Sequence, residues 1–167
     1  MKEIILMKAK LVKSIVAPLL GICGLVTMVA ATAAGQGTQG GRIQGTWETQ
    51  ITLNDCAGHV IRSFQGMLTF QQGGTLMDGT ATPSALRTPG EGVWGHTTGH
   101  NYAFRIKSFN FSAQNVFTGW SIISAELTVD STGDAFAGHG GTVQVYDPNG
   151  VLVATICAES VGTRFQL

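Results

Sequence analysis

Apolar and polar residues alternate along most of the chain after residue 42, and helical spacing is hard to find there. Trp47, Ile51 and Leu53 lie two or four positions apart, with polar residues between them. Since successive side chains of a β-strand point to opposite faces, this two-residue period predicts strands. The pattern predicts about eight of them, near residues 43–54, 60–71, 75–80, 92–97, 101–111, 116–129, 134–146 and 151–165.

Short turn sequences separate these segments. The connections at 55–58, 71–74, 112–115, 130–133 and 147–150 each end in Gly or Asn, the residues that most easily adopt a positive φ. Long strands joined by tight hairpins are typical of a meander, and closing a meander removes its exposed edges. Bends are expected at Gly119, Gly138, Gly140 and Gly141. The sequence therefore predicts an all-β fold, a single antiparallel up-and-down β-barrel of about eight strands.

One connection differs from the tight turns. Residues 81–92 contain two prolines and show no alternation, which predicts a loop of about a dozen residues. Loops of this length in compact domains often cover or form a binding site. Trp94 follows this loop directly, so we expect its indole beside the mouth of the barrel.

The first 33 residues differ from the rest. A stretch with four lysines and one glutamate precedes an apolar run, and the small residues Ala31-Thr32-Ala33 follow. This order is typical of a secretory signal peptide, with cleavage expected after Ala33. An uncleaved membrane anchor and lipidation at Cys23 are the alternatives. We expect a signal peptide at 1–33, a flexible Gly/Gln-rich lead-in at 34–42 and the barrel domain at 43–167, in a secreted or periplasmic protein that leaves the membrane after cleavage.

Composition narrows the function classes. Only 12% of residues are charged, 44% are hydrophobic and 23 are glycine, which argues against a coiled coil and against a disordered chain. The region after the signal segment has no basic cluster or stripe, so a nucleic-acid partner is not expected.

Two cysteines, Cys56 and Cys157, remain after export. An even number in an oxidising compartment predicts one disulfide, which would join the end of the first strand to the last strand. Two buried free thiols are the alternative.

The two ends of the domain carry related short motifs. The first strand begins Gly45-Thr46-Trp47, and the last ends Gly162-Thr163-Arg164. This pair resembles the signature of the lipocalin and calycin barrels, and more narrowly that of uncharacterised exported bacterial lipocalin-like proteins. The resemblance implies a barrel in which Arg164 packs across Trp47 at the closed end.

Candidate ligand-binding residues are aromatic and polar. We expect Trp94, Tyr102 and Trp120 to line the cavity mouth, with His96 and Arg105 fixing the orientation of a ligand. The alternative is that the rings only fill the interior. His96 and His100 would lie about 13 Å apart on one strand face, too far to share a metal, unless a turn at 97–99 brings them together. No third ligand is near in sequence, so no metal site is expected.

A catalytic role would need at least one buried acid or base. Glu126 would be a buried acid or base if its strand face pointed inward, whereas Phe117, Ile123, Ala125, Leu127 and Val129 make the more apolar inward face and would leave Glu126 in water. No nucleophile motif is present, and no catalytic residue or cofactor is assigned.

The leading hypothesis is therefore an exported barrel that binds a small, largely apolar molecule. A non-catalytic structural or interaction protein with a filled barrel, and a barrel isomerase or cyclase, are the alternatives.

Overall fold

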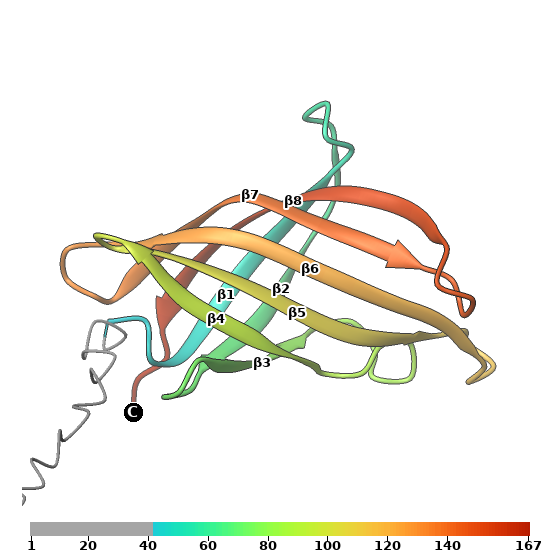
Figure 1. Cartoon of the computed structure of the whole chain (residues 1–167), viewed down its shortest axis with the longest axis horizontal. Helices are drawn as coiled ribbons and strands as arrows, with labels where there is room; N and C mark the ends of the chain where they lie inside the picture. The colour runs from blue at the N-terminus through green and yellow to red at the C-terminus, as the bar shows by residue number, and fades with distance from the viewer. Residues whose placement is uncertain (1–41) are drawn as a thin grey trace, which may run out of the picture. The chain divides into compact units, whose positions relative to one another are not determined.

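The computed structural model describes residues 42–167, in which eight antiparallel strands follow one another and close into a barrel (Figure 1). This confirms the predicted fold class. The strands are β1 Gly45–Asn54, β2 Val60–Phe70, β3 Thr75–Thr80, β4 Gly90–Thr98, β5 Asn101–Phe111, β6 Phe117–Val129, β7 Ala135–Tyr146 and β8 Leu152–Arg164. The expected signal peptide and nearly all of the expected lead-in lie outside the described residues. No helix within residues 42–167 has the length and apolar character needed to cross a membrane.

The barrel closes where the first strand meets the last. β1 pairs with β2 on one side and with β8 on the other, in a register that places Trp47 opposite Arg164. The Arg164 guanidinium lies over the Trp47 ring, 4.3 Å from its centroid, and Trp47 is fully buried. The indole N–H of Trp47 donates to the Ile43 carbonyl oxygen at 2.8 Å. The arrangement implied by the two end motifs is thus present at this end of the barrel.

Arg164 also joins three separate segments through hydrogen bonds. Its Nη1 donates to the carbonyl oxygen of Gln44 at 2.7 Å, and its Nη2 donates to that of Arg42. Both Nε and Nη2 donate to the carbonyl oxygen of Gly133, in the turn between β6 and β7. One side chain therefore fixes the approach to β1, a hairpin turn and the end of β8.

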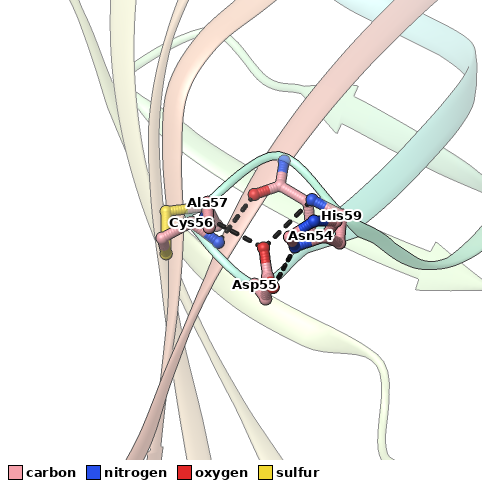
Figure 2. The surroundings of a disulfide bond; sticks show 6 residues. Asn54, Asp55, Cys56, Ala57 and His59 are labelled. Atoms are coloured by element: carbon pink, nitrogen blue, oxygen red, sulfur yellow. Dashed lines mark hydrogen bonds and ion pairs between the residues drawn. A yellow bond between two sulfur atoms is a disulfide. The ribbon is translucent and has the colours of Figure 1, made fainter.

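A disulfide links the other end of the β1–β8 pair. Cys56 lies in the β1–β2 turn and forms a disulfide with Cys157 of β8. Cys157 is also the partner of Asn54 in the last pair of the β1–β8 ladder. The predicted disulfide is confirmed. Figure 2 shows the turn, in which Asp55 accepts hydrogen bonds from the backbone N–H groups of Ala57 and His59. The His59 side chain adds a 2.8 Å contact to the same carboxyl, and these bonds hold the pKa of Asp55 below its ordinary value.

The two halves of the barrel are packed differently. The hydrophobic core lies in the half that contains Trp47, where Trp47 meets the ring of Phe136 edge-on with centroids 5.1 Å apart. Its buried members come from the segment just before β1, the start of β1, the end of β2, the start of β3, the first half of β5, the end of β6 and the start of β7: Ile43, Trp47, Leu68, Phe70, Leu76, Tyr102, Phe104, Ile106, Leu127, Val129 and Phe136. This half is a filled core, and three of its members, Leu68, Phe104 and Ile106, lie where it meets the opposite half.

Irregular pairing bends the other half. The register shifts between Gly138 and Gly141 in the β7–β8 ladder, and the intervening Gly140 has φ +59°. A second shift in the β5–β6 ladder adjoins Gly119, whose φ is +124°. An added Cβ at Gly119 would collide with the Tyr146 carbonyl oxygen. The bends expected at these glycines thus coincide with positions that only glycine occupies without strain.

The β6 strand presents the expected apolar face inward. Leu127 and Val129 are buried, Ile123 and Ala125 pack against the core, and Glu126 is exposed. The reading of Glu126 as a buried acid or base is therefore wrong. Phe117, predicted for the inward face, is instead 39% exposed, because it is the first residue of β6 and lies beyond a register shift.

We expect Arg164→Lys to lower the free energy of unfolding by about 2 kcal/mol, because lysine cannot replace the guanidinium hydrogen bonds to three carbonyl groups. Urea unfolding measures this change. Arg105→Lys is the control, since Arg105 is exposed on β5. Equal effects of the two substitutions would contradict the structural role of Arg164.

Candidate functional site

The half of the barrel opposite Trp47 encloses a cavity of about 290 Å³. Apolar side chains from β1, β2, β5, β6, β7 and β8 form most of its wall: Ile51, Leu53, Phe64, Leu68, Phe104, Ile106, Ile123, Ala125, Val143, Val145, Ile156 and Ala158. The small side chains of Ala125 and Ala158, together with Gly141, leave space that larger residues would fill. The barrel is therefore hollow on this side.

A buried ion pair lies on one wall of the cavity. The Nη2 atom of Arg87 lies 2.8 Å from Oδ2 and 3.1 Å from Oδ1 of Asp78. Side-chain exposure is only 6% for Asp78 and 13% for Arg87. The backbone N–H of Gly90 also donates to Oδ1 of Asp78. Asp78 is thus satisfied, and Arg87 is held inside the barrel with its charge balanced.

Further polar groups lie on the cavity wall. Asn110 Nδ2 donates to the Ser121 hydroxyl oxygen at 2.9 Å, and both residues line the cavity. Thr49 is 4% exposed, also lines the cavity, and its hydroxyl has no hydrogen-bond partner among residues 42–167. A buried hydroxyl without a partner lowers the stability of the fold.

The loop between β3 and β4 covers this side of the barrel. Its residues Thr82, Leu86 and Arg87 line the cavity. Backbone hydrogen bonds fix it to the end of β5, with Phe111 N–H donating to the Leu86 carbonyl and Thr88 N–H donating to the Phe109 carbonyl. The loop expected from the prolines spans residues 81–89, and β4 begins at Gly90, earlier than the pattern suggested.

Two of the candidate ligand residues lie at the filled end. Trp94 is half-buried against Phe70 and Tyr102, and its indole N–H donates to the carbonyl oxygens of Gln71 and Thr75. Tyr102 is buried in the core, and burial raises the pKa of its phenol. The expectation that Trp94 adjoins the mouth fails, because four strand residues carry it about 13 Å from the end of the loop.

The other three candidates also lie outside the cavity. His96 contacts the Tyr102 ring, and its Nε2 lies 2.9 Å from the Gly99 carbonyl oxygen. Arg105 is exposed. Trp120 stacks on Tyr146 with centroids 5.7 Å apart, next to Ser121, which points inward. None of the five lines the cavity. Residues 42–167 also contain no cluster of three His, Cys, Asp or Glu placed to hold a metal.

The sequence carries a signal for the ion pair, although the alternation of the strands alone does not reveal both of its members. Asp78 lies two residues after Leu76, so strand alternation places an acidic group on an apolar face. Arg87 is the charged residue within 81–89. A carboxyl directed inward needs a cation, and the neighbouring loop supplies one.

Comparison with known proteins identifies no family. No family model matches the chain, and no curated protein matches it. Several solved structures show some likeness, including the following two. A redesigned beta barrel, b11L5F_LGL, has 19% identity and a TM-score of 0.42, and Rv2717c from M. tuberculosis has 11% identity and a TM-score of 0.41. Each comparison covers 75% of this chain and 94% of the other.

Replacing Asp78 with Asn leaves the Arg87 charge buried without its counter-ion. We expect Asp78→Asn to lower the free energy of unfolding by about 3 kcal/mol. Asp134→Asn is the matched control: Asp134 lies 3.7 Å from Arg164 but is 59% exposed. Its change should stay within about 0.5 kcal/mol. Denaturant unfolding that ranks the two variants equally would contradict a buried, structurally required pair.

Proposed function

We propose that this protein binds a small, largely apolar molecule in the hollow half of its barrel. The observation that carries the proposal is an apolar cavity of about 290 Å³ with a few convergent polar groups on its wall. Such pockets gain affinity from buried apolar area, while a small number of polar groups fix the ligand's orientation.

The polar groups favour a ligand with one uncharged hydrogen-bonding group. Arg87 uses Nη2 toward Asp78, and its Nε and Nη1 make no hydrogen bond with residues 42–167. These N–H groups can donate to a carbonyl, ether or hydroxyl oxygen. Because Asp78 already balances the guanidinium charge, an anionic group would leave excess negative charge in an apolar site.

Export and a lipocalin-like relationship belong to the same proposal. The disulfide supports an oxidising compartment, where such bonds persist, and the N-terminal pattern is typical of a secretory signal. The eight-stranded closed barrel and the contact of Arg164 with Trp47 support a lipocalin-like protein. The leading alternative is a non-catalytic structural or interaction protein with a filled barrel. Only the half that contains Trp47 supports it, because the other half holds the cavity.

The neutral fluorophore N-phenyl-1-naphthylamine tests the proposal. We expect saturable binding with one site per barrel and a rise in emission. Ala125→Phe should weaken binding at least about tenfold, since a ring at this position occupies ligand space; tenfold corresponds to about 1.4 kcal/mol. Fluorescence titration measures both.

Ile122→Phe is the matched control. It adds a ring to the same strand, at a position that does not line the cavity. Thermal unfolding checks that both variants remain folded. An absence of saturable binding, or equal binding by the two variants, would contradict binding inside the barrel.

A further inference from the structure

The β8 strand extends beyond its partner on one side. The β1–β8 ladder ends at the pair Asn54 and Cys157, yet β8 begins at Leu152. Residues 152–156 pair with β7, from Tyr146 with Leu152 to Val143 with Ile156. Figure 1 shows this part of β8 beside β7, while the β1–β2 hairpin projects in another direction. Within the described residues, the other edge of 152–156 has no strand partner.

This edge lacks the usual features that prevent strand pairing. Residues 151–156 read Val-Leu-Val-Ala-Thr-Ile, with no charge and no proline. Val151, Leu152 and Val153 are 57%, 47% and 59% exposed. Natural edge strands are commonly protected by charges, proline or bulges, because unpaired N–H and C=O groups attract another strand.

The comparable edge of β2 also exposes apolar side chains, Val60 and Ile61, but it carries a charge. β2 pairs with β3 only from Gly66 onward, so its first residues also lack a partner on that side. That stretch contains Arg62 and follows the turn with Asp55 and His59. The contrast marks the β8 edge as the one suited to pairing.

We propose that the Leu152–Ile156 edge of β8 pairs antiparallel with the same edge of a second copy of this chain. An antiparallel pair of identical strands is related by a two-fold axis, so each copy satisfies the unpaired backbone groups of the other. The absence of charge means that no like charges face each other across the axis. This pairing does not depend on ligand binding.

The length of the open edge sets the register. The disulfide at Cys157 limits one end, and the turn at 147–150 limits the other. Centring the pair on the open segment puts Ala154 on the two-fold axis. Leu152 then lies opposite Ile156 of the second copy, and Val153 lies opposite Thr155. Ala154, which has the smallest side chain of the segment, thus lies opposite Ala154 of the second copy.

Sedimentation of the full chain, expressed with export and purified without reductant, tests the proposal. We expect a dimer at micromolar concentration and loss of the dimer in Val153→Lys, because the two lysines would be diagonal neighbours on one face of the paired sheet and repel each other, and lysine commonly protects edge strands. Val161→Lys is the matched control: Val161 is 58% exposed on the same strand, where β8 is paired on both sides. It should remain a dimer. A monomeric wild-type protein, or association that persists in Val153→Lys, would overturn the proposal.

Cysteine cross-linking tests the register. Ala154→Cys should form an intermolecular disulfide with itself, because residues directly opposite in an antiparallel pair have Cα atoms about 4.5–5.5 Å apart. Val153→Cys alone should not, whereas a mixture of Val153→Cys with Thr155→Cys should cross-link. Peptide mapping identifies the bond. Cross-linking of Val153→Cys to itself as readily as Ala154→Cys, or none in any variant, would overturn the pairing.

Discussion

The contact between Arg164 and Trp47 is the interaction on which the barrel depends. A sheet of eight strands closes only if its first and last strands meet, and these two residues are opposite each other in that last ladder. The guanidinium covers the indole face while its N–H groups bond to three backbone carbonyls. Arginine suits this position because a planar cation can stack on a ring and donate in several directions at once.

The two ends of the closed barrel differ in how their interiors are packed. Large apolar side chains fill the half near Trp47, whereas Ala125, Gly141 and Ala158 keep space open in the opposite half. The disulfide holds the β1–β2 hairpin to β8 where their hydrogen-bonded ladder stops. Rigidity therefore comes from the filled half and the covalent link, and these support the cavity without occupying it.

Much of the fold could be predicted from the sequence because each local signal agrees with closure. The two-residue period placed the strands, the Gly- and Asn-terminated turns placed the hairpins, and the cysteine pair matched the last ladder. Glu126 could also be assigned, since the residues alternating with it are more apolar.

The cavity could not be predicted in the same way. Strand alternation separates two faces but does not show which half of a barrel is filled, because that depends on side chains from strands far apart in sequence. Trp94 follows the loop in the chain, yet its position along β4 carries it toward the core. The Asp78–Arg87 pair needs a strand and a loop to meet, a contact that only tertiary structure reveals.

The division into a filled and a hollow half is tested most directly by amide NMR during titration with N-phenyl-1-naphthylamine. The account predicts chemical-shift changes concentrated at cavity residues such as Ile51, Phe64 and Val143, with little change around Trp47, Leu76 and Val129. Changes centred on the Trp47 end, or spread over the outer face of the barrel, would contradict it.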